Sequence, residues 1–147
     1  MAGEALVHKT LMKIISKINV FVYRLANGKL MGSLKGSPIC LVTMRGRKTG
    51  RRITIPLIYV AHGENVVLIA SQGGAPKHPV WYHNLVADPE VEIQAGSVRR
   101  AMKVRQASDT EKAEVWPHAV AFYIEFDDYQ AKTDRNIPLL ICTPSGT

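Results

Sequence analysis

The sequence predicts an α+β domain built around a small, closed or partly closed antiparallel β-barrel of about six strands. Its 147 residues, 46% of them hydrophobic, suffice for one buried core and leave no length for a second domain. Short apolar runs separated by turn residues fill the middle of the chain, while helical periodicity lies outside them. We therefore expect one domain over residues 1–147, with an N-terminal helix region at 1–30, the main barrel strands at 38–106, and C-terminal helices and a last strand at 108–147.

The N-terminal region reads as an amphipathic helix. Between residues 6 and 25, apolar residues recur at steps of three and four, as on one face of a helix. Lys9, Lys13 and Lys17 form a basic stripe on another face. Such a helix most often caps a core, but the stripe also allows contact with an anionic membrane surface or an anionic ligand. A flexible, glycine-containing stretch follows at residues 28–38.

Six strands follow from the apolar runs and the turn residues between them. They are expected at residues 39–44, 53–60, 65–71, 91–95, 98–106 and 137–143. The turn signals at 46–50, 62–63 and 95–97 predict that the first three strands, and likewise the fourth and fifth, are antiparallel and joined by hairpins.

Three helical segments are expected outside the strands. Residues 81–87 form a short helix that ends at Asp88. Ser108 and Glu111 have the spacing of a capping box, which opens a helix through residues 113–116 that Pro117 must kink or end. Residues 121–134 are aromatic and acidic, and part of this segment is expected to be helical.

Several classes of protein are excluded by what the sequence lacks. The longest apolar runs, at 66–70 and 138–142, are far too short for a membrane-spanning helix, and no secretory signal is readable, so we expect an intracellular protein. Cys40 and Cys142 lie far apart in strand-like runs and are expected to be buried free thiols. The five histidines have no metal-ligand spacing, and the fingerprints of phosphate-binding loops, Rossmann folds and serine hydrolases are absent.

The charge of the chain is unevenly distributed. Residues 1–107 carry 16 Lys or Arg and 5 Asp or Glu, whereas residues 108–147 carry 3 and 7. Five of the cations fall within eight positions, at Arg45, Arg47, Lys48, Arg51 and Arg52. Such a cluster suits phosphate or carboxylate groups, which predicts a polyanionic ligand. A solvated basic hairpin tip is the alternative.

Residues 71–84 add two further groups that commonly build binding sites. Ser71 and the pair Gly73-Gly74 end a strand, where backbone N–H groups can approach a ligand. Trp81 and Tyr82 offer flat surfaces for a ring. Each feature alone is more often structural, as a plain turn or as core aromatic residues, and it is their combination with the basic cluster that indicates a site.

The chain resembles a known family, the deazaflavin-dependent nitroreductases and quinone reductases of split β-barrel fold. The resemblance spans nearly the whole chain. Its motifs are Ile18-Asn19, Tyr23-Arg24, Gly46-Arg47-Lys48-Thr49-Gly50, Pro56-Leu57, Tyr59, Ala70-Ser71, Gly73-Gly74, Pro79, Trp81-Tyr82, Asn84-Leu85, Asp88-Pro89, Trp116-Pro117, Asp128-Tyr129-Gln130, Thr133-Asp134-Arg135 and Ile137-Pro138.

The resemblance implies the cofactor coenzyme F(420), a 5-deazaflavin whose phosphate and oligoglutamate tail make it a polyanion, and no metal. The basic turn is then expected to bind the phosphate and tail, and the ring is expected near the strand ends, with two aromatic residues and an asparagine closing the pocket. The expected cofactor-binding residues are Arg47, Lys48, Thr49, Arg52, Pro56, Leu57, Ala70, Ser71, Gln72, Trp81, Tyr82 and Asn84. A family arginine is replaced by Ile53, and in a regular strand Arg52 points to the opposite face.

The implied reaction is hydride transfer from the reduced deazaflavin to an electron-poor conjugated acceptor, and we expect a quinone in preference to an enone or a nitroaromatic. Positioning then dominates catalysis, with Ser71, Tyr123 and Tyr129 expected to donate hydrogen bonds to the acceptor. Together with Phe126 these residues are expected to line the acceptor site. Phe126 replaces a tyrosine of the family's nitroreductases; the loss of this hydroxyl argues against bulky nitroimidazole-type acceptors and leaves quinone reduction open.

Other functions stay open at this point. A split barrel with FMN, or a non-catalytic barrel that binds lipids or fatty acids, would fit the same apolar content. The net charge of +7 raises nucleic-acid binding, but no reader motif accompanies it, so we expect no nucleic-acid partner. We expect a cytoplasmic protein that can contact the membrane face peripherally through its N-terminal helix.

Overall fold

The computed structural model describes residues 33–34 and 37–145 of the chain. The predicted helix at residues 6–25, its lysine stripe and the membrane contact assigned to it lie outside the described residues. So does most of the stretch at 28–38. The predicted division into regions 1–30, 38–106 and 108–147 stays a prediction.

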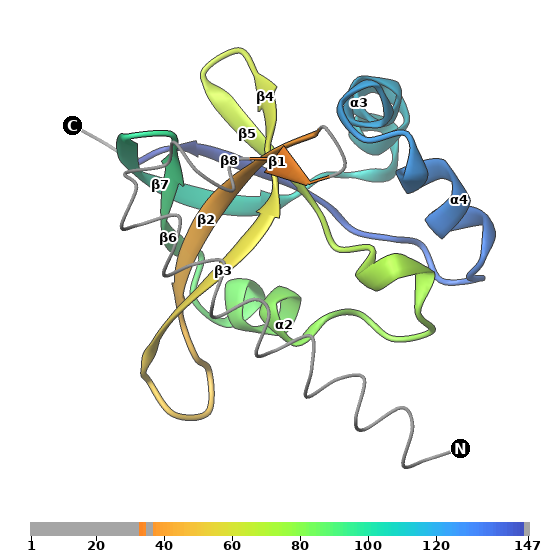
Figure 1. Cartoon of the computed structure of the whole chain (residues 1–147). Helices are drawn as coiled ribbons and strands as arrows, with labels where there is room; N and C mark the ends of the chain where they lie inside the picture. The colour runs from red at the N-terminus through yellow and green to blue at the C-terminus, as the bar shows by residue number, and fades with distance from the viewer. Residues whose placement is uncertain (1–32, 35–36, 146–147) are drawn as a thin grey trace.

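The described chain forms eight strands and four helical segments (Figure 1). The strands are β1 (Ser33–Leu34), β2 (Ser37–Arg45), β3 (Arg52–Ile58), β4 (Val60–His62), β5 (Asn65–Ile69), β6 (Glu90–Ala95), β7 (Val98–Gln106) and β8 (Leu139–Pro144). The helical segments are a 3-10 turn, η1 (Gln72–Gly74), and the helices α2 (Val80–Ala87), α3 (Asp109–Phe122) and α4 (Glu125–Ala131).

The strands form one curled antiparallel sheet, which confirms the predicted α+β barrel class. The strand order is β1-β2-β6-β7-β8-β5-β4, and β3 pairs with β2 outside this path. β3 and β4 thus lie at opposite ends of the sheet, yet only Tyr59 separates them in the chain. The sheet must therefore curl until these two ends meet, as a half-barrel does.

The predicted strand over residues 53–60 is wrong in one respect, because it divides at Tyr59. The part before it pairs with β2 in a regular register from Arg45↔Arg52 to Ile39↔Ile58. The part after it pairs with β5, from Val60↔Val67 to His62↔Asn65. Tyr59 itself donates its backbone N–H to Pro38 O at 2.8 Å. The predicted middle strand is thus two strands: β3 forms a hairpin with β2, and β4 forms a separate hairpin with β5. The described chain therefore has more strands than the six that were predicted.

The helix opened by Ser108 is confirmed, and of the two predicted effects of Pro117, a kink or an end, the end is wrong. Ser108 Oγ accepts from the N–H of Glu111 at 3.2 Å, and Glu111 Oε1 accepts from the N–H of Ser108 at 3.1 Å. The helix then continues through Pro117 to Phe122. Proline removes one backbone hydrogen bond, and burial of Val115 and Ala119 against the sheet carries the helix past it.

Two clusters of buried residues make up most of the core. The first contains Cys40, Val42, Met44, Val66, Leu68, Leu85, Val91, Ile93, Met102, Val104, Leu140 and Cys142. The second lies against α3 and α4 and contains Val60, Val67, Ile69, Val115, Ala119, Tyr123, Phe126, Ile137, Leu139 and Ile141. Both cysteines are buried free thiols, as predicted, and burial raises the pKa of each to about 12.

The helices flank the sheet in two places (Figure 1). α3 and α4 lie together on one side, whereas α2 lies near the long loop that joins β2 to β3. None of the helices in the described part of the chain has the length and apolar character needed to cross a bilayer.

Candidate cofactor and acceptor site

The basic turn, residues 45–52, closes the hairpin between β2 and β3. Gly46 N–H donates to Arg51 O, and Gly50 N–H donates to Gly46 O, both at 2.8 Å. Gly50 has a φ of +71°, a conformation that favours glycine. The hydroxyl oxygen of Thr49 accepts from the backbone N–H of Arg51 at 3.2 Å. The turn is therefore a defined structure held by its own backbone and by Thr49.

Most of the cations on this turn have no acidic partner. Arg45 lies 3.6 Å from Asp88 Oδ2 and donates to Gly50 O at 3.4 Å. The other four are exposed, and no carboxylate of residues 33–34 and 37–145 forms an ion pair with them: Arg47, Lys48, Arg51 and Arg52. Uncompensated cations on a fixed turn are a donor set suited to phosphate and carboxylate oxygens.

Asn84 of α2 binds the backbone of this turn through its side chain. Its side chain is only 4% exposed, its Oδ1 accepts from the backbone N–H of Arg47 at 3.1 Å, and its Nδ2 lies 3.8 Å from Met44 Sδ. The sequence indicated Asn84 as a pocket-closing residue, whereas its contacts are with the turn. It fixes the backbone from which the cations of the turn project.

The second part of the predicted site is the β5–α2 loop, residues 70–79. Three successive residues in it have positive φ angles: Gln72 at +45°, Gly73 at +64° and Gly74 at +81°. A Cβ on Gly74 would lie 2.7 Å from Tyr129 O, so the loop packs against α4 at a distance that only glycine allows. Ser71, at the start of the loop, is 8% exposed. Its hydroxyl forms no hydrogen bond with another described residue.

Arg135, for which the sequence predicted no role in the site, binds this loop. It donates to the carbonyl oxygens of Ala70, Ser71 and Ala75 and lies beside His78. The sequence offered two signals, since Arg135 belongs to the family motif Thr133-Asp134-Arg135 and is one of three cations in an otherwise acidic C-terminal quarter. Three of its four partners are backbone carbonyls, which leave no pattern in the sequence.

The remaining predicted cofactor residues are placed between these two parts or in the core beneath them. Trp81, Tyr82 and Leu57 pack against the first core cluster. The Tyr82 hydroxyl donates to Gln106 Oε1 at 2.6 Å. Ala70 is fully buried, and Pro56 is half-buried in β3, where side chains alternate between the two faces.

The register of β3 settles the orientation of Arg52 relative to Ile53. Arg52 pairs with Arg45 and Ile53 with Met44, with no bulge between these pairs. Successive side chains of a strand point to opposite faces. Arg52 and Ile53 therefore point to opposite faces of β3, which is the arrangement expected from the sequence.

Of the four residues predicted for the acceptor site, the three aromatic ones lie together. The ring centroids of Tyr123 and Phe126 are 5.0 Å apart, those of Tyr123 and Tyr129 are 6.1 Å apart, and those of Phe126 and Tyr129 are 6.5 Å apart. This aromatic cluster belongs to the core beneath α3 and α4, and Phe126 is only 3% exposed.

A carboxylate that the sequence analysis missed connects the two phenols. Glu125 Oε2 accepts from the hydroxyl of Tyr123 at 2.6 Å and from that of Tyr129 at 2.8 Å. Burial first, and then hydrogen bonds to Glu125 and Tyr129, raise the pKa of Tyr123 above its ordinary value. Its phenol therefore stays protonated and can serve as a hydrogen-bond donor.

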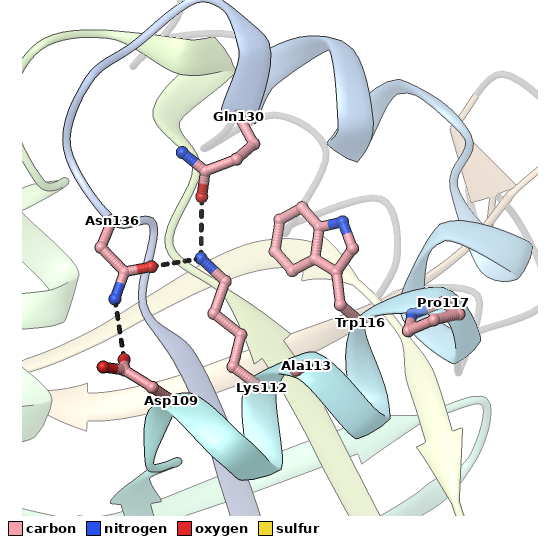
Figure 2. Close-up of a pocket in the computed structure, with 7 residues that line it drawn as sticks. All are labelled: Asp109, Lys112, Ala113, Trp116, Pro117, Gln130 and Asn136. Atoms are coloured by element: carbon pink, nitrogen blue, oxygen red, sulfur yellow. Dashed lines mark hydrogen bonds between the residues drawn. The ribbon is translucent and has the colours of Figure 1, made fainter.

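Two cavities open near α4. One, of about 390 Å³, is lined by Gly74, Pro76, Lys132, Thr133, Asp134 and Arg135, beside the β5–α2 loop. The other, of about 370 Å³, is lined by Asp109, Lys112, Ala113, Trp116, Pro117, Gln130 and Asn136. Figure 2 shows the ammonium of Lys112 in this second cavity, donating to Gln130 Oε1 at 2.7 Å and Asn136 Oδ1 at 2.6 Å. Neither cavity is lined by a residue of the aromatic cluster.

Comparisons with known proteins agree on one family. A family model described as F(420)H(2)-dependent quinone reductase matches residues 15–144. A protein of Mycobacterium tuberculosis, provisionally named as an F(420)H(2)-dependent quinone reductase, is 40% identical over 113 residues, or 77% of this chain and 95% of the relative. A further F(420)H(2)-dependent quinone reductase of that species is 34% identical over 126 residues, or 83% and 85% of the two chains.

The same family appears among solved structures. The structure of an F(420)-H(2) dependent reductase superposes with a TM-score of 0.68 at 39% identity and covers 71% of this chain and 93% of its own. Sequence and fold therefore point to the same group of proteins.

Proposed function

The chain belongs to the F(420)H(2)-dependent quinone reductase family, and we propose that its basic turn, β5–α2 loop and aromatic cluster receive the coenzyme tail, the coenzyme ring and the acceptor, respectively. It is an oxidoreductase that uses reduced coenzyme F(420) to reduce quinones. When bound, the reduced coenzyme supplies the hydride. The residues of the chain have to bind the coenzyme, orient the acceptor over its ring and donate hydrogen bonds to the acceptor.

The observation that carries the assignment of the tail is the set of cations on the basic turn that form no ion pair with any described residue. Arg47, Lys48, Arg51 and Arg52 are exposed on a turn whose backbone is fixed by Asn84. Their donors fit the phosphate and the glutamate carboxylates of the coenzyme, because charge-assisted hydrogen bonds to such oxygens are the strong ones. Thr49 shapes the turn and keeps its hydroxyl proton for a ligand oxygen.

We assign the ring to the space between the β5–α2 loop and α2. Ala70, Ser71 and Gln72 are expected to border it on the loop side, Pro56 and Leu57 on the strand side, and Trp81 and Tyr82 on the helix side. The support is that this loop has a strained residue and a fixed backbone: Gln72, which is not a glycine, has a φ of +45°, and Gly74 closely approaches α4. Such strain persists where the surrounding structure holds it and is typical of ligand sites.

For the acceptor, the chain offers three hydroxyl groups with different surroundings. Ser71 has no competing partner among the described residues, whereas Tyr123 and Tyr129 donate to Glu125. Ser71 is therefore the donor best prepared to hydrogen-bond an acceptor oxygen as negative charge develops there. The two tyrosines, held by Glu125, are expected to border the acceptor together with Phe126.

One experiment tests the whole assignment. The purified protein is titrated with reduced and oxidised coenzyme F(420), and in parallel with FMN. Menadione is then added, and reoxidation of the coenzyme is followed by absorbance with and without protein. We expect binding of the deazaflavin in preference to FMN and faster reoxidation with the protein. Binding of FMN alone, or lipid that copurifies without any coenzyme affinity, would contradict the proposal and select a flavoprotein or a lipid-binding barrel.

We also propose that the protein is cytoplasmic and contacts the membrane face through residues 6–25. The lysine stripe beside an apolar face supports this contact. Sedimentation with vesicles of phosphatidylglycerol and phosphatidylcholine tests it. We expect the full chain to sediment with the anionic vesicles and to stay in solution with the neutral ones; sedimentation with neither would refute it.

A further inference from the structure

Arg135 binds the β5–α2 loop through every nitrogen of its guanidinium group. Nε donates to Ala75 O at 2.8 Å and Nη2 donates to Ser71 O at 2.6 Å. Nη1 donates to Ala70 O at 3.2 Å and lies 2.8 Å from His78 Nδ1. One side chain thereby connects residues at the start, the middle and the end of the loop.

These contacts meet a need of the loop backbone. Residues 72–74 have positive φ angles, so their segment continues neither as a strand nor as an α-helix. The carbonyls that Arg135 binds flank this segment, and one of them, Ser71 O, also accepts from the N–H of Gly74 at 2.9 Å. Buried carbonyls outside regular structure are costly when they lack partners. The fork of an arginine presents donors in several fixed directions, which a lysine ammonium cannot reproduce. Arg135 therefore provides hydrogen-bond donors to the loop carbonyls and, by the same contacts, fixes the geometry of the loop.

The backbone around Arg135 is itself fixed by side-chain hydrogen bonds. Gln130 Nε2 donates to Arg135 O at 2.8 Å, while Gln130 Oε1 accepts from the N–H of Ile137 at 3.1 Å. The N–H of Arg135 donates to Thr133 Oγ1 at 3.3 Å. The backbone on both sides of Arg135 is thus fixed, and its side chain is oriented before any ligand arrives.

We propose that Arg135 is a positioning residue that holds the β5–α2 loop in the shape that receives the coenzyme ring. This inference rests on the proposed function, because the loop contains Ser71 and Gln72, which are assigned to the ring. Arg135 acts through the backbone of the loop, so it sets the affinity for the coenzyme more than the affinity for the quinone.

The test compares Arg135→Gln and Arg135→Lys with the wild-type protein and with Arg105→Gln. Arg105 is the matched control, because it also forms a bidentate contact, with Glu111 on α3, and is not part of the proposed site. Amide hydrogen exchange of residues 71–75 is measured without coenzyme. We then measure, for each variant, the Kd for F(420), the KM values for F(420) and menadione, kcat and the melting temperature.

We expect faster amide exchange in residues 71–75 of Arg135→Gln, and a Kd and KM for F(420) raised roughly 10- to 100-fold with little change in the KM for menadione. Arg135→Lys should lie between Arg135→Gln and wild type. Arg105→Gln should lower the melting temperature without these effects. If Arg135→Gln does not fold, Arg135→Lys decides the matter by the same readouts.

Two outcomes would overturn the proposal, and they differ from failure of the proposed function. Unchanged loop exchange in the Arg135 variants would show that the arginine does not hold the loop. An unchanged Kd, with wild-type protein binding F(420), would show that the held shape is irrelevant to the coenzyme. Absence of binding by wild-type protein would instead reject the proposed function.

Discussion

At the scale of single residues, the basic turn separates binding groups from the groups that support them. Its five cations are exposed to solvent, and four of them form no ion pair with a described residue, whereas the buried Asn84 contacts the backbone of Arg47. A cation without an acidic partner keeps its full charge for a ligand, and a fixed backbone reduces the entropy lost when that ligand binds. The two kinds of residue should therefore respond differently to substitution.

Replacing Lys48 by alanine should weaken coenzyme binding while leaving stability almost unchanged. The lost charge-assisted contact is expected to cost about 1–3 kcal/mol, or roughly 5- to 150-fold in Kd. Titration with F(420), together with a urea unfolding curve, measures both quantities. Lys103→Ala is the control, since Lys103 is an exposed cation on β7. Equal effects of both variants would show that the turn acts only through net charge.

Replacing Asn84 by leucine should change both stability and binding. The variant leaves the N–H of Arg47 without its acceptor, which is expected to lower the free energy of unfolding by about 1–3 kcal/mol. The loosened turn should also raise the Kd for F(420). Gln94 offers a matched control, because its buried side chain donates to Gly96 O in the turn between β6 and β7. Gln94→Leu should destabilise the protein without changing the Kd; a Kd unaltered in Asn84→Leu would show that the turn needs no such support.

At the scale of the elements, α3 begins with a network that reaches beyond its capping box. Arg105 donates to both carboxylate oxygens of Glu111, at 2.9 and 2.8 Å. Glu111 also bonds the backbone N–H of Ser108. These contacts, led by the hydrogen bond from Arg105, lower the pKa of Glu111 to about 2. The end of β7 and the start of α3 are therefore joined through one carboxylate.

This network should make the protein sensitive to acid in a defined window. The pKa of Glu111 is lower in the folded chain than its ordinary value of 4.5, so its stabilisation is complete above about pH 4.5. It is lost as the pH falls from there towards about 2. The difference in urea midpoint between wild type and Glu111→Gln should thus be constant from about pH 7 to pH 5 and shrink at lower pH. A difference independent of pH down to about pH 3 would refute the role of the charge.

The elements also show which parts of the fold were predictable from sequence. β7 and the capping box at Ser108 were correct because their signals, alternation and cap spacing, are local. The division at Tyr59 was missed because the same extended run pairs with two different partners, and only the closed sheet determines where it changes. The continuation of α3 past Pro117 depends on burial of its neighbours, which outweighs the local cost of proline.

The candidate site was predictable to a similar extent. The cations of the basic turn and the aromatic residues of α3 and α4 were identified by residue type and by family resemblance, and the aromatic residues do lie together. Glu125 was missed, and Arg135 was noted only as part of a family motif, without a role. Arg135 contacts backbone carbonyls up to 65 residues away in the chain, and Glu125 accepts from two phenols that only folding brings together.

At the scale of the whole molecule, charge is separated along one direction. The basic turn lies at the far end of the hairpin formed by β2 and β3, whereas α4, which starts with Glu125, Asp127 and Asp128, lies on the opposite side of the molecule (Figure 1). A polyanionic coenzyme is therefore attracted by its tail to the basic end and repelled at the acidic end. This polarity favours one orientation of the coenzyme, with its tail at the turn.

The affinity for the coenzyme should accordingly fall with ionic strength. The cations of the turn are exposed, and at 0.1 M salt the attraction between exposed charges more than about 10 Å apart is largely screened. We expect the Kd for F(420) to rise several-fold between roughly 0.05 and 0.5 M NaCl, while the KM for menadione, a neutral molecule, stays constant. Lys48→Ala should show a shallower dependence because it removes one of the screened contacts. A Kd independent of salt would mean that the tail binds elsewhere, and equal slopes for wild type and Lys48→Ala would remove Lys48 from the tail site.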